Sequence, residues 1–264
     1  MKALVITDLD GTLLDHHSYD WRPAQPALAA LAAAGIPVVF NTSKTYAESQ
    51  ALQAQMGVSA PLIVENGSCV HLADGARIVL GRSRAELCAL LEAQGCAARY
   101  RYQSFRALGE AGVQAQTGLS AEQARLAATR AWSEPLLWQD APERIAALRA
   151  ELAPLGCNVL VGGRFVHVLG DCDKGRAAQA LRERLAPQAT LVALGDRPND
   201  VAMLAAADIA IWVPNAQAGP EAGEAGGWQR PAQPAHARTA PAAGPAGWCR
   251  AILQLLHDGE LRAA

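Results

Sequence analysis

The 264-residue chain has no strong excess of charge of either sign: its formal net charge is −2, and acidic and basic residues are spread along it. Proteins that bind nucleic acids or membrane surfaces normally carry a basic face, so we expect neither as a partner. The apolar run before Asp8 is too short for a signal-peptide core. Every other apolar run is interrupted by a charge, a proline or a glycine before it reaches membrane-spanning length. We therefore expect a cytoplasmic protein.

The six cysteines include no CxxC pair, which makes a zinc site built from them improbable. They are widely spaced, at Cys69, Cys88, Cys96, Cys157, Cys172 and Cys249. In a chain without an export signal this spacing predicts reduced thiols packed in the interior.

Short apolar runs that alternate with helical segments indicate an α/β fold with a parallel sheet. Runs rich in β-branched residues occupy 3–7, 36–42 and 61–65, and helices are expected between them at 23–34 and 45–56. This β-α-β-α-β order predicts a parallel sheet covered by helices. The same alternation returns later in the chain, with helices at 174–185, 199–206 and 247–257 and strands at 190–195 and 208–213.

Residues 82–168 interrupt this alternation, and we predict that they form an inserted α+β domain. The sheet domain would then consist of residues 1–81 and 169–264, with a Pro/Ala/Gly-rich loop at 214–247. Within the insertion we expect helices at 83–94 and about 120–131, an amphipathic strand at 99–105, a strand at 136–139, and a hairpin at 157–169 that turns at Gly162-Gly163.

Polar residues follow the predicted parallel strands, at the sheet edge where chemistry is usually placed. Asp8 and Asp10 follow the first strand, Thr42 the second, and Asp196 the strand at 190–195. Residues i and i+2 of an extended segment point the same way, so Asp8 and Asp10 face a common space. Two carboxylates about 4 Å apart repel by roughly 4 kcal/mol at an effective dielectric of 20. This arrangement calls for a cation, and oxygen ligands suit Mg²⁺. The alternative, that these acids are unrelated caps and turn formers, is disfavoured by their gathering at one edge.

The segment DLDGTLLD at 8–15 resembles the haloacid dehalogenase superfamily of phosphotransferases. NTSK at 41–44, Lys174 at a helix start and GDRPND at 195–200 follow in the order typical of that family. The resemblance implies a Rossmann-like, three-layer parallel-sheet core (the HAD fold) and a cap formed by the insertion. NTSK departs from the expected pattern in having Asn41 where we would expect Cys.

The resemblance also implies a role for each motif residue and an aspartyl-phosphate mechanism. Asp8 would be the nucleophile and a Mg²⁺ ligand. Asp10 would protonate the leaving group, activate water and offer its backbone carbonyl to the metal. The remaining roles are a hydrogen bond to phosphate for Thr42, charge neutralisation for Lys174, completion of the metal site for Asp196, and orientation of metal-bound water or Lys174 for Asn199 and Asp200.

Each of these residues also has a structural interpretation. Thr42 is equally suited to cap the helix at 45–56. Lys174 follows Asp173, a suitable N-cap, and a lone lysine in a helix is usually solvated. Asn199 and Asp200 are also typical of a turn that begins a helix. The presence of the whole set favours the functional interpretation for Lys174 and Asp200.

Several longer segments are similar to one branch of the superfamily, the mannosyl-3-phosphoglycerate phosphatases. They are DLDGTLLDHHSYDW (8–21), FNTSKTYAE (40–48), IVENGS (63–68), TGLS (117–120), RAWSEPLLWQD (130–140), GGRFVHVLGDCDKG (162–175), LGDRPND (194–200) and GPAGW (244–248). The implied substrate is a small phosphorylated sugar-glycerate, acted on by a monomer or a homodimer. The residues do not separate a mannosyl from a glucosyl substrate.

The candidate substrate-binding residues lie in both predicted domains. Arg164, beside the flexible Gly163, is a suitable clamp for a carboxylate because guanidinium binds carboxylate bidentately. Arg130 and Glu134 are candidates to bond hydroxyl or carboxylate groups, and His167 lies in the same hairpin. The sheet domain would contribute Ser43, Lys44 and Asn66. Arg and Glu often pair simply for structure, and His in a strand is often structural.

Other functions are compatible with parts of the sequence. A sucrose- or trehalose-phosphate phosphatase or a phosphosugar mutase would use the same scaffold. A metabolite-binding protein without catalysis would be expected to lack Asp8, Asp10 or Lys174, and all are present. The run RYRYQSF at 99–105 would suit nucleic acid, but one such stretch in a chain of net charge −2 is better explained as a lid strand.

Overall fold

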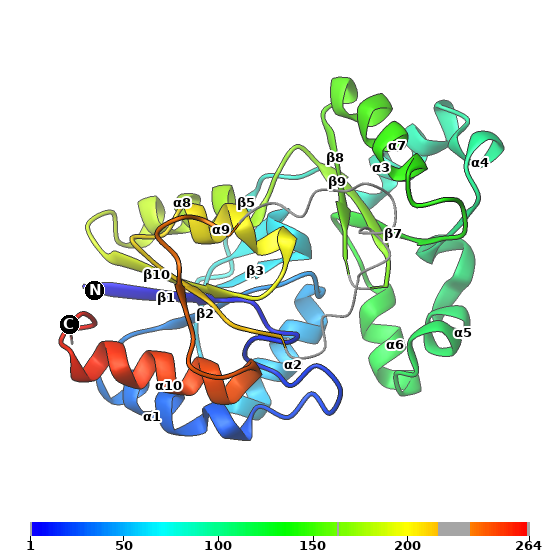
Figure 1. Ribbon diagram of the computed structural model, residues 1–264. Helices are drawn as coiled ribbons and strands as arrows, with labels where there is room; N and C mark the ends of the chain where they lie inside the picture. The colour runs from blue at the N-terminus through cyan, green and yellow to red at the C-terminus, as the bar shows by residue number, and fades with distance from the viewer. Residues whose placement is uncertain (1, 163, 216–232, 263–264) are drawn as a thin grey trace.

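The computed structural model describes residues 2–162, 164–215 and 233–262, and its larger part is built on an eight-stranded sheet (Figure 1). The strands are β1 (Ala3–Thr7), β2 (Val38–Asn41), β3 (Leu62–Val64), β4 (Cys69–His71), β5 (Arg77–Val79), β10 (Thr190–Gly195), β11 (Ile209–Trp212) and β12 (Arg238–Thr239). Their order is β12-β11-β10-β1-β2-β3-β4-β5. Pairing is parallel from β12 through β3 and antiparallel for β4 and β5. We call this sheet and its helices the large lobe.

Helices cover both faces of this sheet, which gives the expected three layers (Figure 1). The helices of the large lobe are α1 (Gln25–Ala33), α2 (Tyr46–Met56), α8 (Lys174–Leu185), α9 (Val201–Ala205) and α10 (Gly244–His257). Alternate residues of β1 point to opposite faces: Val5 packs in the core that includes α1 and α10, and Ile6 packs in the core that includes α8 and α9. The continuous burial of β1, inferred from its apolar run, is confirmed.

The chain between β5 and α8 builds a second sheet, which with its helices forms the small lobe (Figure 1). Its strands are β6 (Tyr102–Ser104), β7 (Ser133–Trp138), β8 (Cys157–Val161) and β9 (Val166–Gly170), antiparallel in the order β6-β7-β9-β8. Its helices are α3 (Arg84–Ala93), α4 (Cys96–Arg99), α5 (Phe105–Thr117), α6 (Ala121–Ala128) and α7 (Arg144–Leu152). Separate hydrophobic clusters fill the spaces on the α3/α7 side and the α5/α6 side.

The structure adds elements that the sequence patterns did not predict. The β4–β5 hairpin, α5 and α7 were not expected, and α10 begins at Gly244 rather than near residue 247. Of the predicted loop at 214–247, residues 216–232 lie outside the described ones, and β12 occupies part of the remainder. All six cysteines are buried and free, as predicted.

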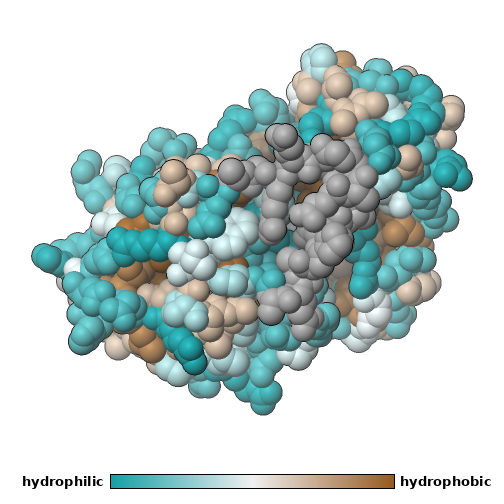
Figure 2. Space-filling model, in the orientation of Figure 1, coloured by the Kyte–Doolittle hydropathy of each residue, from teal (hydrophilic) through white to brown (hydrophobic). Residues whose placement is uncertain are grey.

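The face shown in Figure 2 is mainly hydrophilic, with hydrophobic residues in small separate groups. Among the helices of the described ranges, none is both long and apolar enough to cross a membrane.

Candidate active site

The parallel strands of the large lobe end at a common edge, and Asp8 lies there. Its backbone N–H donates to the carbonyl of Leu194 in β10, at 2.9 Å, so the residue just beyond β1 remains tied to the neighbouring strand. The side chain of Asp8 is buried. Gly11, directly after Asp10, has a φ of 88°, and a Cβ atom there would lie 2.6 Å from Asp196 Oδ2. Only glycine therefore fits this turn between the two acidic segments.

Lys174 is the first residue of α8 and is fully buried. Its Nζ lies 2.6 Å from Asp8 Oδ1 and 2.6 Å from Asp200 Oδ1. Burial alone would lower the pKa of Lys174, but the carboxylates of Asp200 and Asp8 outweigh it and raise this pKa above its ordinary value. The solvated-lysine interpretation is therefore wrong. Asp173 does cap the helix, accepting from the N–H groups of Gly175 and Arg176.

Asn41, the departure from the family pattern, also contributes to the placement of Lys174. Its Nδ2 donates to the backbone carbonyl of Lys174 at 2.9 Å and lies 3.2 Å from Met203 Sδ. The side chain of Asn41 is fully buried behind the site. It thus supports the start of α8 from the end of β2.

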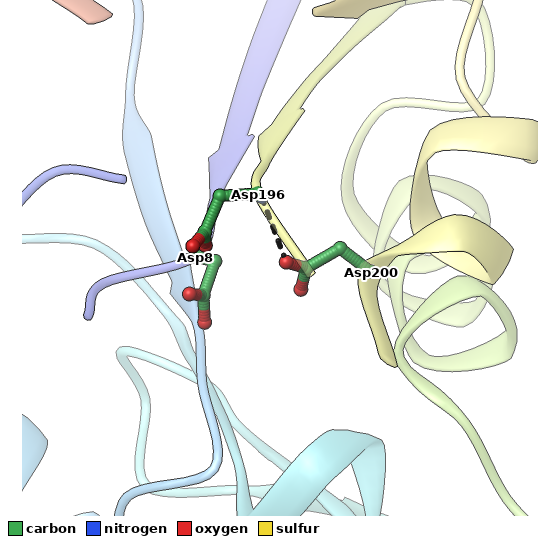
Figure 3. A group of neighbouring side chains, drawn as sticks. All are labelled: Asp8, Asp196 and Asp200. Atoms are coloured by element: carbon green, nitrogen blue, oxygen red, sulfur yellow. Dashed lines mark hydrogen bonds between the residues drawn. The ribbon is translucent and has the colours of Figure 1, made fainter. Parts of the chain in front are cut away.

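Three buried carboxylates converge beyond β1 and β10 (Figure 3). One oxygen each of Asp8, Asp196 and Asp200 lie within 4.8 Å of one another. Burial and the nearby carboxylates of Asp200 and Asp196 raise the pKa of Asp8 well above its usual range, although Lys174 opposes the shift. Burial, together with Asp200, raises the pKa of Asp196 to about 6. Lys174 bridges Asp8 and Asp200, and Arg197 Nε lies 3.6 Å from Asp196 Oδ2, so two cations face three carboxylates and the cluster keeps an excess of negative charge.

The hydrogen bonds of these acids distinguish their roles. Asp200 Oδ1 accepts from Lys174, and Asp200 Oδ2 accepts from the N–H groups of Asp196 and Arg197, both at 3.0 Å. Asp196 accepts one bond at each oxygen, from Thr12 Oγ1 and Asn215 Nδ2, both at 2.8 Å. Asp200 is therefore already used in orientation, whereas Asp196 keeps acceptor capacity for a cation. An all-oxygen donor set with excess negative charge fits Mg²⁺.

Asp10 lies beside this cluster and not within it. Its Oδ2 is 2.8 Å from Lys44 Nζ, and Lys44 also lies 5.2 Å from the centre of the Tyr19 ring. Asp10 Oδ1 is buried and has no hydrogen-bond partner among the described residues. Asp10 lines the cavity next to Asp8, so this oxygen is available to a ligand. The predicted use of its backbone carbonyl by a metal stays a prediction.

The loop after β2 holds the predicted phosphate-binding residues. Thr42 is fully buried, and its Oγ1 accepts from the N–H of Lys44 at 3.1 Å. The helix-capping role considered for Thr42 belongs instead to Thr45, which forms a reciprocal capping box with Glu48 at the start of α2. Thr42 therefore does not cap α2.

A cavity of about 450 Å³ opens in front of Asp8 and lies between the two lobes. Its lining includes most of the predicted substrate-binding residues, namely Ser43, Lys44, Asn66, Arg130, Arg164 and His167, together with Asn199. Asn199 Nδ2 donates to Asn66 Oδ1 at 3.1 Å, which joins the loops after β10 and β3 at the cavity wall.

The small lobe presents basic side chains to this cavity. Arg130 Nη1 donates to the Ser43 carbonyl at 3.0 Å, while its Nε has no partner within the described part of the chain. Arg164 Nη1 donates to the Gln116 carbonyl at 2.8 Å. His167 is buried, and burial together with Arg130 lowers its pKa to about 3, so the imidazole is neutral. Gly163, also a predicted binding residue, lies outside the described residues.

Glu134 is placed differently from the other candidates. It is fully buried and does not line the cavity. Its carboxylate contacts Arg84 Nε and accepts from the backbone N–H of Arg106 at 2.8 Å. The geometry thus gives Glu134 the structural pairing that the sequence left as an alternative.

Sequence reasoning missed several residues at this site. Thr12 and Asn215 hold Asp196, and Tyr19, with a φ of 55°, lines the cavity mouth. Thr12 could have been identified from the sequence, because it lies within the acidic motif at 8–15. Asn215 carries no local signal, since its contact depends on the return of the chain after β11.

The three-layer fold with a mainly parallel sheet and an acidic edge is consistent with a family comparison. A profile of the haloacid dehalogenase-like hydrolase family matches residues 5–83 and 164–220, just over half of the chain. The chain therefore belongs to this family. The two matched segments contain Asp8, Thr42, Lys174, Asp196 and Asp200.

Solved structures share the whole architecture at low sequence identity. A Thermoplasma acidophilum protein is 18% identical with a TM-score of 0.71, covering 99% of this chain and 100% of its own. The sucrose-phosphatase from Synechocystis, solved with sucrose and phosphate, is 19% identical with a TM-score of 0.67, covering 97% and 98%. A phosphatase of the same superfamily from Bacteroides thetaiotaomicron is 16% identical with a TM-score of 0.66, covering 99% and 96%. At these identities the likeness shows the fold alone.

Proposed function

We propose that the protein is a Mg²⁺-dependent phosphohydrolase that removes the phosphate of a glycosyl-3-phosphoglycerate, with a mannosyl or glucosyl group, in the cytoplasm. It would act as a monomer or homodimer without nucleic acid or membrane. The observation that carries the proposal is the placement of Lys174 Nζ 2.6 Å from both Asp8, which lines the cavity, and Asp200. A buried carboxylate with a fixed ammonium and an open side is suited to attack phosphorus.

The reaction proceeds in two displacements. An Asp8 oxygen forms a bond to phosphorus while the ester P–O bond breaks, and the leaving oxygen takes a proton from Asp10. Asp10 then removes a proton from water, whose oxygen attacks phosphorus and releases inorganic phosphate and free Asp8. Throughout, Lys174 offsets negative charge at Asp8, and Thr42 donates its hydroxyl hydrogen to a phosphoryl oxygen.

Asp8, Asp196 and the backbone carbonyl of Asp10 would hold Mg²⁺. When bound, it supplies positive charge to the phosphoryl oxygens and lowers the repulsion between nucleophile and phosphate. The pKa of Asp8 and that of Asp196, at about 6, are raised by burial and by the neighbouring carboxylates, and a bound cation would relieve this repulsion.

The small lobe supports a substrate with a second anionic group. Arg130 and Arg164 of the small lobe line the cavity, opposite Lys44 of the large lobe, and a carboxylate of glycerate would pair with such cations. Arg130 Nε and His167 Nδ1 have no hydrogen-bond partner among residues 2–162, 164–215 and 233–262, which leaves bonding capacity for the glycosyl hydroxyls or the carboxylate. The small lobe would act as a lid that excludes water during the reaction.

A second candidate is a phosphatase of a disaccharide phosphate without glycerate. It is favoured by the likeness to the Synechocystis sucrose-phosphatase, which extends over 97% of this chain. It accounts less directly for Arg130 and Arg164, the cationic side chains that the small lobe adds to the cavity, since one phosphate needs fewer cations.

Phosphate release from a substrate panel tests the proposal. The panel contains mannosyl- and glucosyl-3-phosphoglycerate, free 3-phosphoglycerate, sucrose 6-phosphate and trehalose 6-phosphate, with Mg²⁺ or with a chelator. Asp8→Asn is the inactive variant, and Asp20→Asn, a half-buried acid paired with the exposed Arg22, is its matched control. Preference for a glycosyl-glycerate that needs both Mg²⁺ and Asp8 supports the full proposal. Preference for a disaccharide phosphate selects the second candidate, and no release from any ester rejects hydrolysis.

A further inference from the structure

Glu65 is a buried carboxylate to which neither the family motifs nor the proposed reaction gives a role. It follows β3 in the large lobe and is 1% exposed. Its φ is 50° and that of Asn66 is 60°, so two consecutive non-glycine residues are left-handed. Such a conformation is costly for these residue types and persists where surrounding contacts enforce it.

The contacts of Glu65 cross from the large lobe to the small lobe. Glu65 Oε1 accepts from the N–H of Ala131 at 2.9 Å, and Oε2 accepts from the N–H of Trp132 at 3.1 Å and from Ser133 Oγ at 2.6 Å. Arg130 Nη1 donates to Ser133 Oγ at 3.1 Å and lies 3.9 Å from Glu65 Oε2. One carboxylate thus binds the segment that leads from α6 into β7.

The same turn is fastened to the catalytic loops. The N–H of Glu65 donates to the Lys44 carbonyl at 3.0 Å, and the N–H of Asn66 donates to the Thr42 carbonyl at 2.9 Å. A Cβ atom on Gly67, whose φ is 89°, would lie 2.2 Å from the Asp173 carbonyl, directly before Lys174. The turn at 65–67 therefore touches the phosphate loop and the start of α8 while it holds the small lobe.

Further contacts show that this is where the lobes meet. Trp132 packs against the hydrophobic core of the large lobe. Arg130 binds the Ser43 carbonyl, and Thr45 Oγ1 donates to the Leu126 carbonyl at 3.1 Å. The carboxylate of Glu65 is buried at this contact between the lobes. Hydrogen bonds to a buried carboxylate are stronger than those between neutral groups, so we expect its three bonds to contribute most to the contact.

We propose that Glu65 is a positioning residue: its carboxylate fastens residues 131–133 of the small lobe onto the loop that carries Thr42 and Lys44. This fixes Arg130 at the cavity when substrate is bound. The expected effect on turnover rests on the proposed function, whereas the contact between Glu65 and residues 131–133 does not. Glu65 touches no substrate, so its loss should weaken binding of substrates that contact the small lobe and spare those that do not.

Two variants test this proposal from opposite sides. Glu65→Gln is nearly isosteric but turns one acceptor oxygen into an amide donor facing an N–H group. Ser133→Ala removes one hydrogen bond from the partner segment and leaves Glu65 intact. Glu122→Gln is the control, since Glu122 is an exposed small-lobe acid that pairs with Arg125 in the same helix.

The first readout is amide hydrogen exchange, which needs no activity. Protection of the Ala131 and Trp132 amides should fall about tenfold in Glu65→Gln, because a hydrogen bond to a charged group is lost. Unchanged protection of these amides would overturn the proposal. The result stands whether or not the protein hydrolyses the proposed substrate.

The second readout compares two phosphate esters. p-Nitrophenyl phosphate offers a phosphate but no carboxylate or sugar hydroxyl for the small lobe. In Glu65→Gln, and to a smaller extent in Ser133→Ala, KM for the glycosyl-3-phosphoglycerate should rise about tenfold while kinetics with p-nitrophenyl phosphate change less than about twofold. Glu65→Asp, which keeps the charge, should recover part of the loss. An equal fall with both esters would indicate a general structural role and overturn the positioning role. If the wild type hydrolyses neither ester, the proposed function fails. The exchange measurement alone then tests whether Glu65 holds residues 131–133 in place.

Discussion

The ammonium group of Lys174 lies 2.6 Å from a carboxylate oxygen of Asp8; Lys174 is fully buried, and Asp8 is 6% exposed where it lines the cavity. Residues 166 positions apart are thus joined at the centre of the site. Such a pair keeps both side chains ionised in the interior, because the attraction between them offsets the cost of removing each charge from water.

The first prediction concerns the loss of that ammonium. Lys174→Met should lower the free energy of unfolding of the metal-free protein by about 3–5 kcal/mol, because Asp8 and Asp200 are left buried without a counter-charge. Asp8→Asn should cost less, since Lys174 keeps its contact with Asp200. Urea unfolding at pH 7 with chelator measures both, and Lys2→Met, at an exposed position, is the control. A loss below about 1 kcal/mol for Lys174→Met would contradict the assignment of buried charge.

The second prediction concerns the cation. Mg²⁺ at about one hundred times its Kd should stabilise the wild type by about 2.7 kcal/mol, because it binds only the folded site. In Asp196→Asn the gain should largely vanish, since one ligand carboxylate is lost. Thermal unfolding with and without Mg²⁺ measures the difference, and Asp74→Asn, in an exposed turn, should respond as the wild type does. Equal stabilisation of Asp196→Asn would show that Asp196 is not a ligand.

The third prediction concerns pH and His167. Burial and Arg130 lower the pKa of this imidazole from 6.5 to about 3, so the unfolded chain takes up a proton before the folded one does. Its contribution to stability is therefore complete above pH 6.5 and is lost as the pH falls toward 3. At pH 5 the loss should be roughly 2 kcal/mol.

Urea unfolding at pH 7 and pH 5 gives the change in unfolding free energy for the wild type and for each variant. Subtracting the wild-type change from that of a variant cancels the contribution of the acidic cluster. His167→Asn should lose about 2 kcal/mol less than the wild type between the two pH values. His257→Asn, an exposed histidine in α10, should match the wild type. If His167→Asn keeps the full acid sensitivity, the imidazole is not held neutral.

Much of the large lobe was predictable because its signals are local. The apolar run of β1, the Thr45–Glu48 capping box of α2 and the left-handed Gly57 that ends α2 all lie within the segments they define. The missed elements lack such signals. Strands β4 and β5 are three residues each, too short to show a period, and Gly109 introduces a non-helical φ of 60° within α5.

The site residues also divide into those with a local sequence signal and those without one. The motifs marked Asp8, Lys174 and Asp196 because each follows a strand or begins a helix at the reactive edge. Glu65 gave no such signal, since its partners at 131–133 come from another lobe. Glu134 was assigned to substrate because a sequence does not tell which face of β7 it occupies. It stands opposite Val168, which is buried in the small-lobe core, whereas the neighbouring His167 points to the cavity.

The fourth prediction follows from that placement of Glu134. Glu134→Gln should lower the free energy of unfolding by about 3 kcal/mol, because Arg84 and the N–H of Arg106 lose a buried anionic partner. KM for the preferred phosphate ester should change less than about threefold, since Glu134 does not face the cavity. Arg130→Met, at the cavity wall, should raise KM at least about tenfold. Glu122→Gln, an exposed ion-pair variant, should alter neither quantity. A large rise in KM for Glu134→Gln with unchanged stability would instead mean that the carboxylate turns to the cavity when substrate binds and contacts its hydroxyl groups.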